Sequence, residues 1–265
     1  MKSRRWPLYS LLAFGYAFLY VPVLLLVIYS FNASRLVTVW GGFSTRWYGE
    51  LLNNEQILDA AWLSMRIAAV NATLAVILGS LAAMALVRYG RFRGRAGLEL
   101  LLAAPLVMPD VIIGLSLFLL FVTLQQVLGW PEGRGFTTIT LAHITFSMAY
   151  ATVVIRARLA QMDRSLEEAA LDLGARPLVV FLRITLPLMA PALLSAWLLA
   201  FTLSLDDLVI ASFVAGPAST TLPMVVYSSV RLGVSPQINA LASLILLFVT
   251  LAVIIAGLAM GRRRP

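Results

Sequence analysis

Residues 67–87 read IAAVNATLAVILGSLAAMALV, a run of 21 residues without a charged side chain. A helix that crosses the hydrocarbon core of a bilayer needs about 20 mainly apolar residues, so this run predicts a membrane-spanning helix. Further charge-free runs of at least 21 residues lie at 6–34, 111–131, 135–155, 184–205 and 232–261. The pattern predicts an all-α membrane protein.

We place six transmembrane helices near 8–30, 62–87, 98–124, 137–156, 188–214 and 237–260. The uncharged stretch 208–230 is not a seventh, because its Gly216, Pro217 and Pro223 are typical of a turn. The first helix is expected to stay attached as an anchor, since its apolar core is too long for a signal peptide. These helices are expected to form a single transmembrane domain, 1–265, with a cytoplasmic loop at about 157–187.

The composition supports a membrane protein and excludes an ordinary soluble one. Apolar residue types make up 61% of the 265 residues and charged types only 12%, whereas soluble domains carry about 25% charged residues. The chain has no cysteine, which excludes disulfides, thiolate metal sites and a cysteine nucleophile.

The basic residues predict the orientation in the membrane. Fifteen of the 20 lysines and arginines fall on one side of the six predicted helices, in 2–5, 88–95, 156–183 and 262–264. Basic residues accumulate in cytoplasmic segments, so both termini are expected in the cytoplasm.

The chain lacks the residues for chemistry of its own. Lys2 is its one lysine, and a phosphate-binding loop needs a lysine after its second glycine. His143 is its one histidine, which excludes paired-histidine metal sites, and we expect it to make a hydrogen bond between packed helices. We therefore expect no catalytic residue, no metal site and no bound cofactor, and any ATPase must be another polypeptide.

The loop between the fourth and fifth predicted helices reads as two short helices separated by a break. Ser165 and Glu168 have the spacing of a capping box, Gly174 stands where a left-handed residue would end the first helix, and Pro177 suits the first turn of the second. This segment is either a cytoplasmic docking element or an ordinary connector on the lipid headgroups.

The same loop carries a recognisable motif. Glu168-Ala169-Ala170, Gly174 and Ile184-Thr185-Leu186-Pro187 match every fixed position of the EAA-x3-G-x9-I-x-L-P pattern of ABC-importer permeases. The segments 103–112 and 201–213 resemble the polyamine branch of these permeases, and the resemblance extends over essentially the whole chain.

This resemblance implies a permease subunit of a type I importer for putrescine or spermidine in the bacterial inner membrane. It further implies a sister permease, two copies of a cytoplasmic ATPase that binds ATP and Mg, and a periplasmic polyamine-binding protein. The residues implied to couple the permease to the ATPase are Glu167, Glu168, Ala169, Ala170, Gly174, Ala175 and Pro177.

Carboxylates at membrane depth are candidates for the path of a cationic substrate, because ionisable groups there are costly and mark function. They are Asp110, Asp206 and Asp207. Asp206 is expected to share a helix face with Thr202 and Phe213, and we favour it over Asp207 for the lumen. Either aspartate could instead pair with an arginine of the sister chain or stay hydrated, and Asp110 could cap a helix that restarts after Pro109.

Aromatic side chains offer a second way to bind a cation. Trp197, Phe213 and Tyr227 are candidates for the substrate path, with helix packing as the alternative. The aromatic residues within 32–61 form either an interfacial belt or a surface that contacts the binding protein.

Two other functions remain open at this point. An ion- or proton-coupled secondary carrier would use the same aspartates as a relay, although no inverted repeat typical of such carriers is recognisable. A purely structural scaffold would leave the membrane-buried acids unexplained.

Overall fold

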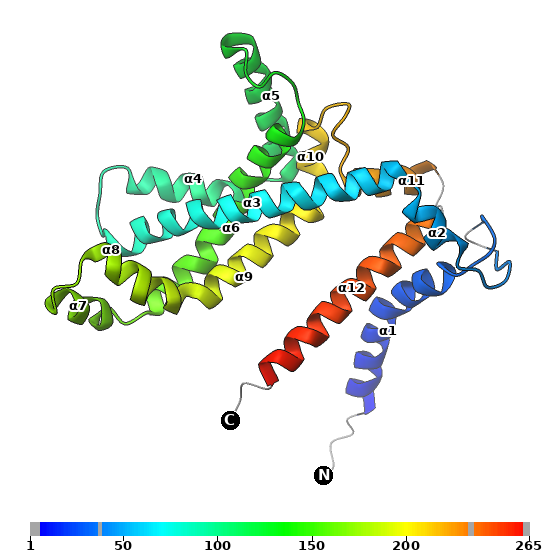
Figure 1. Cartoon of the computed structure of the whole chain (residues 1–265), viewed down its shortest axis with the longest axis horizontal. Coiled ribbons are helices and arrows are strands. Elements are labelled where there is room, and N and C mark those ends of the chain that lie inside the picture. Colours follow the sequence, from blue (N-terminus) through cyan, green and yellow to red (C-terminus); the bar gives the residue numbers. More distant parts are fainter. Residues whose placement is uncertain (1–5, 37–38, 233–235, 262–265) are drawn as a thin grey trace. The chain divides into compact units, whose positions relative to one another are not determined.

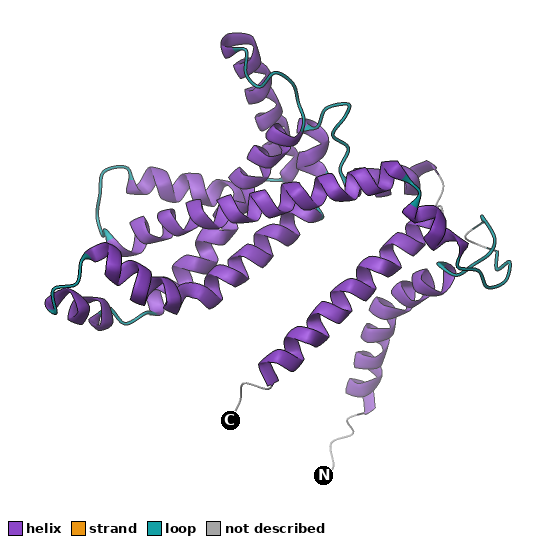
Figure 2. Cartoon of the chain, in the orientation of Figure 1, coloured by secondary structure: helices purple, strands orange, loops and turns teal. Residues whose placement is uncertain are grey.

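Every regular element in the described part of the chain is a helix, as Figure 2 shows. The computed structural model describes residues 6–36, 39–232 and 236–261. Five of its helices are long and apolar enough to cross a membrane, and the described part of the last helix adds a shorter apolar segment at Pro236–Leu251. The expected all-α membrane fold is thereby confirmed. The basic residues expected at 2–5 and 262–264 lie outside the described residues.

The chain divides into two compact units, residues 1–58 with 226–265 and residues 59–225. In the first unit, α12 (Pro236–Gly261) packs against α1 (Trp6–Tyr29) and α2 (Arg46–Leu52). The unit also holds the first residues of α3 and the last residues of α11.

A buried asparagine organises the loop that joins α1 to α2. The Oδ1 atom of Asn32 accepts the N–H groups of Ser34 and Gly41, at 3.1 and 2.7 Å, and its Nδ2 donates to the carbonyl of Val39 at 2.8 Å. Trp47 Nε1 donates to the Asn32 carbonyl at 2.5 Å. These bonds satisfy the backbone of an irregular segment that has no ladder or helix of its own.

The second unit contains most of the helices, drawn from cyan to orange in Figure 1. They are α3 (Glu55–Arg88), α4 (Arg95–Val107), α5 (Asp110–Leu128), α6 (Phe136–Gln161), α7 (Ser165–Asp172), α8 (Pro177–Val180), the π turn η1 (Phe181–Thr185), α9 (Leu186–Leu205), α10 (Val209–Val214) and α11 (Leu222–Leu232). Of these, α3 begins in the first unit and α11 ends there.

Helix α6 is the centre of this unit and packs along α9 and α4 (Figure 1). Many of its buried positions hold small side chains, among them Ala142, Ser147 and Ala151, which allow membrane helices to approach closely. Asn71 of α3 donates to the Ser147 hydroxyl at 3.2 Å and to the Ala200 carbonyl of α9 at 2.9 Å. One buried amide thus joins three helices.

The span expected at 98–124 is not one continuous helix, because the chain breaks between α4 and α5 at the restart after Pro109 that the sequence offered as an alternative. Met108 has an extended conformation, with ψ of 140°, and Pro109 follows it before α5 begins at Asp110. Proline has no N–H to donate and disfavours the helical conformation of the residue before it. The break therefore follows from Pro109.

The expected helix at 188–214 is also interrupted. Helix α9 ends at Leu205, and α10 begins at Val209 after three residues outside the helices. Asp206 and Asp207 consequently do not lie on one continuous helix. The shared face expected for Asp206 and Phe213 does not exist.

Candidate functional site

The predicted cytoplasmic loop forms two short helices, α7 and α8. Gly174 has φ of +80°, its N–H donates to the Leu171 carbonyl at 2.9 Å, and the Ala175 N–H donates to the Ala170 carbonyl at 3.0 Å. This pair of bonds is a Schellman motif, which ends a helix on a left-handed residue. Pro177 is the first residue of α8, so the expected break and restart are confirmed.

The expected capping box is wrong. Ser165 is already the first residue of α7 and makes no side-chain cap, because Asp163 provides the local acceptor. The Asp163 carboxylate accepts the Ser165 N–H at 2.9 Å, and this hydrogen bond lowers the pKa of Asp163. Glu168 therefore has no capping role.

The loop residues predicted to couple to an ATPase divide by exposure. Glu168, Ala169, Gly174 and Pro177 are exposed, and Ala170 and Ala175 are half-buried. Glu167 instead turns toward the body of the second unit.

One carboxylate oxygen of Glu167 has two partners there. Glu167 Oε1 lies 2.8 Å from Arg88 Nη2 at the end of α3, and Thr185 Oγ1 at the end of η1 donates to the same oxygen at 2.9 Å. Arg164 Nη2 adds a bond to the Val87 carbonyl at 2.7 Å. Sequence reasoning missed Arg88, although it is the first charge after the uncharged run 67–87.

The two adjacent aspartates after α9 have different surroundings. Asp206 is exposed and ends α9, its N–H bonded to the Thr202 carbonyl. The carboxylate of Asp207 accepts the backbone N–H groups of Ile210 and Ala211 at 3.3 and 2.7 Å. Asp207 thus satisfies the free N–H groups at the start of α10, as a helix N-terminus requires.

His143 joins the same break from α6. Its Nε2 lies 3.1 Å from Asp207 Oδ2 and its Nδ1 lies 2.7 Å from Ser204 Oγ. The side chains of His143 and Asp207 are 3% and 11% exposed. The expected helix-packing hydrogen bond of His143 is confirmed, and it joins α6 to Ser204 and Asp207.

The remaining predicted substrate-path residues of the second unit lie on separate elements. Asp110 is exposed in the first turn of α5 and makes no side-chain hydrogen bond to the described residues. Thr202 is exposed and donates to the carbonyl of Leu198 in its own helix. Phe213 packs on Gly114 within the apolar cluster of α5, α6 and α10.

The predicted aromatic candidates also differ in setting. Trp197 stacks on Phe201, with ring centroids 5.1 Å apart, and its Nε1 donates to Thr73 Oγ1 of α3 at 3.2 Å. Tyr227 is exposed on the part of α11 that belongs to the first unit.

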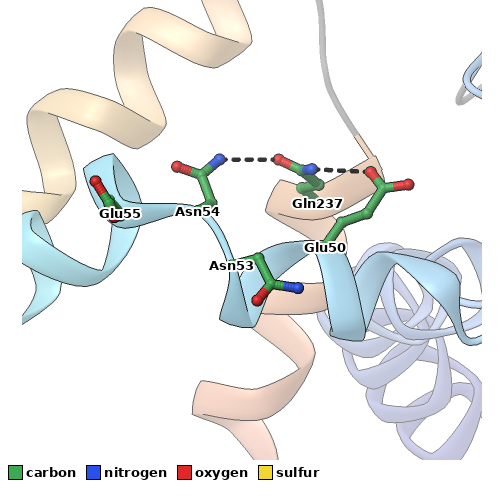
Figure 3. A pocket seen from close by; sticks show the side chains of 5 residues that line it. All are labelled: Glu50, Asn53, Asn54, Glu55 and Gln237. Atoms are coloured by element: carbon green, nitrogen blue, oxygen red, sulfur yellow. Dashed lines mark hydrogen bonds between the residues drawn. The ribbon is translucent and has the colours of Figure 1, made fainter.

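The first unit has an open, polar hollow of about 510 Å³. It is lined by Glu50, Asn53, Asn54, Glu55 and Gln237, and Figure 3 shows Gln237 bonded to both Asn54 and Glu50. The aromatic residues of segment 32–61 differ in exposure: Trp47 is buried, whereas Trp40 and Phe43 are 48% and 73% exposed. The rings of Phe43 and Tyr48 each lie 5.3 Å from that of Phe31. Among the described residues no group of three or more histidines and carboxylates could hold a metal ion.

The chain is similar to several transport permeases over most of its length. It is 63% identical over 252 residues to "Putrescine transport system permease protein PotI" of Escherichia coli (strain K12), covering 95% of this chain and 90% of that protein. It is 43% identical over 247 residues to "Spermidine/putrescine transport system permease protein PotC" of the same strain, covering 93% of this chain and 90% of that one.

Solved transporters share the fold. A chain of a bacterial ABC transporter involved in the import of the acidic polysaccharide alginate aligns with a TM-score of 0.71 at 16% identity, over 100% of this chain and 99% of that chain. A chain of the MetNI methionine ABC transporter, in an inward-facing conformation, aligns with a TM-score of 0.60 at 15% identity, over 78% of this chain and 94% of that one.

The model of the family described as "Binding-protein-dependent transport system inner membrane component" matches residues 75–263. This range includes the EAA loop, α9 and both aspartates of the break. The chain therefore belongs to the family of binding-protein-dependent ABC-importer permeases, the inner membrane components of these systems.

Proposed function

We propose that this chain is a permease subunit of an ATP-driven importer of putrescine or spermidine. The observation that carries the proposal is its 63% identity, over 95% of the chain, with a protein named as a putrescine transport permease. The spermidine/putrescine permease at 43% identity supports the same class of substrate. Flexible chains with two or more ammonium groups are therefore the expected cargo.

The proposed partner for energy is a separate ATPase that contacts the exposed side of α7. Glu168 and Ala169 are both exposed. Glu168 carries a charge, and the small side chain of Ala169 next to it leaves room for a side chain of the partner. A carboxylate that makes no cap in its own helix is free to pair with a cation of the partner. ATP and Mg belong to that ATPase, and the permease binds no cofactor itself.

For the substrate path we propose Asp206 as the principal carboxylate of this chain, with Asp207 holding the helix break in place. Asp206 is exposed at the end of α9, whereas the Asp207 carboxylate already has two backbone donors and His143. Asp110, Thr202, Phe213, Trp197 and Tyr227 remain proposed members of the path. The ammonium groups of a polyamine need such partners to replace their water.

A complete importer requires further chains. We assign to it a sister permease, two copies of the ATPase and a periplasmic polyamine-binding protein, in a bacterial inner membrane with both termini of this chain in the cytoplasm. The relatives are named as parts of transport systems, which supports a heteromeric complex. High substrate affinity is assigned to the binding protein, because a path that held a diamine tightly would not release it.

Uptake in cells tests the class of substrate. A strain without polyamine importers, expressing this chain with the other chains of its system, should accumulate radiolabelled putrescine, and excess spermidine or putrescine should compete whereas excess arginine should not. Expression without this chain is the control. Equal competition by arginine, or no uptake of either polyamine, would contradict the proposed substrate class.

A further inference from the structure

The acids Glu167 and Glu168 of α7 are adjacent in sequence and opposite in environment. Glu168 is exposed, but the Glu167 side chain is only 18% exposed and that of Arg88 only 15%. Thr185, the third member of the contact, is buried. Charges this sheltered are screened less by salt than surface pairs, and removing one partner leaves the other uncompensated.

A single oxygen of Glu167 joins three segments that are distant in sequence. It bonds Arg88, the last residue of α3, at 2.8 Å and Thr185, the last residue of η1, at 2.9 Å. These partners lie 79 and 18 positions away along the chain. Any displacement of Glu167 is therefore applied to α3 and to the start of α9 together.

The rest of α7 is weakly held. None of its residues is fully buried, and beside it lies a cavity of about 160 Å³ bordered by Met84, Leu171 and Phe181. Arg164, just before α7, donates to the Val87 carbonyl at the end of α3 and not to η1 or α9. Glu167 is thus the described side chain of α7 that bonds directly to the segment leading into α9.

The segment that Glu167 holds continues without interruption to the proposed substrate path. Residues Pro177–Leu205 form one helical stretch, with the π turn at Phe181–Thr185 inside it. Such wide turns are frequent at functional sites. Asp206 follows directly at the far end, so a pull on Thr185 acts on the helix that positions Asp206.

We infer that Glu167 is a positioning residue that transmits the movement of α7 to α3 and α9, while Glu168 contacts the ATPase. This inference rests on the proposed function, since it assigns the two acids of one loop to two successive steps of the same transport cycle. Without the Glu167 carboxylate the ATPase should still bind the permease and hydrolyse ATP. The movement of α7, however, should be transmitted less completely to α3 and α9.

The test uses the complete importer in proteoliposomes and measures putrescine transported per ATP hydrolysed. Glu167→Ala should retain ATPase activity and co-purification with the ATPase, and should lower the transport per ATP by about tenfold, within the range that single residues change coupling. The double variant Arg88→Glu with Glu167→Arg restores the pair, because the Thr185 hydroxyl can accept as well as donate, and should recover most of the loss. Glu99→Gln is the control: it removes a more exposed carboxylate, which pairs with Arg95 in α4 and lies 3.9 Å from Arg156 of α6, and because exposed ion pairs contribute little it should leave the transport per ATP nearly unchanged.

A distance measurement separates failure of the inference from failure of the proposed function. The chain has no native cysteine, so spin labels can be attached through Tyr89→Cys and Leu173→Cys, two positions that are 73% and 88% exposed. Trapping the complex with nucleotide should leave the separation of the labels unchanged in the parent protein and should alter or broaden it in Glu167→Ala. A wild-type importer that moves no polyamine overturns the proposed function, and the label distances then still decide the role of Glu167.

Label distances that stay unchanged on nucleotide trapping in Glu167→Ala, as in the parent protein, would overturn the inference. Two transport results would also overturn it. One is a Glu167→Ala importer that transports as much putrescine per ATP as the Glu99→Gln control. The other is a charge-swapped double variant that assembles but transports as little putrescine per ATP as Arg88→Glu or Glu167→Arg alone. If Glu167→Ala fails to assemble, the charge-swapped double variant carries the test alone. Transport per ATP near the wild-type value then supports the inference, and transport per ATP far below it overturns the inference.

Discussion

Nε2 of His143 lies 3.1 Å from Oδ2 of Asp207, and this contact joins α6 to the break between α9 and α10. Both side chains are nearly inaccessible. The arrangement fits a neutral imidazole that donates a hydrogen bond from Nε2 to the carboxylate and accepts one from the Ser204 hydroxyl at Nδ1. The break is held by a polar contact between helices as well as by its own backbone.

Replacing His143 should therefore destabilise the fold. We expect His143→Leu to lower the free energy of unfolding by about 1–3 kcal/mol, the cost of leaving a buried polar partner unsatisfied, measured by thermal unfolding in detergent. Thr145→Ala is the matched control, because Thr145 is on the same helix but exposed. Equal stability of the two variants would contradict the structural role of His143.

The neighbouring aspartates should separate in their effects. Asp206→Asn should slow putrescine uptake by about tenfold, the effect of ~1.4 kcal/mol on a barrier, with unchanged thermal stability. Asp207→Asn should lower the stability, because its carboxylate caps α10 and binds His143. Ser212→Ala, an exposed change in α10, serves as the control for both. The reverse assignment of the two phenotypes would refute the distinction.

Gly174 should be sensitive to backbone conformation and insensitive to side-chain volume. Its φ is +80° and nothing lies within 4 Å of the position a Cβ would take. A non-glycine residue in this region costs about 1–2 kcal/mol, and asparagine tolerates it better than others. Transport should fall in the order wild type, Gly174→Asn, Gly174→Val, with the amount of permease in the membrane as the control. Asparagine and valine variants of equal activity would show that the left-handed turn does not matter.

Glu168→Gln should reduce uptake without changing stability. Its side chain makes no cap in α7, so the loss has to come from the contact with the ATPase. Asp172→Asn, which removes an exposed carboxylate from the same helix, should be nearly neutral. Co-purification of the ATPase with each variant measures the contact, and full retention of both uptake and ATPase by Glu168→Gln would contradict it.

The uncharged membrane helices, the end of α7 and the start of α8 could be predicted from local sequence alone. Charge-free runs report the length that a bilayer requires, and Gly174 and Pro177 report backbone conformations that few other residues adopt. The break at Pro109 was visible in the same way. The capping box failed because Asp163, two residues earlier than Ser165, offered a competing acceptor.

Features that depend on distant parts of the chain were beyond local reasoning. The break after Leu205 has no proline or glycine, and its stabilising partner His143 is 64 positions from Asp207. The opposite orientations of Glu167 and Glu168 likewise depend on Arg88, 79 positions away. The hydrophobic periodicity of one helix does not predict such long-range contacts.

The energy source of transport tests the whole account most directly. The complete importer, reconstituted in proteoliposomes with the binding protein and putrescine, should transport when ATP reaches the ATPase. Without ATP, an imposed proton gradient should drive no uptake, and collapsing the gradient in the presence of ATP should change nothing. Uptake driven by the gradient in the absence of ATP would contradict the account and identify a secondary carrier instead.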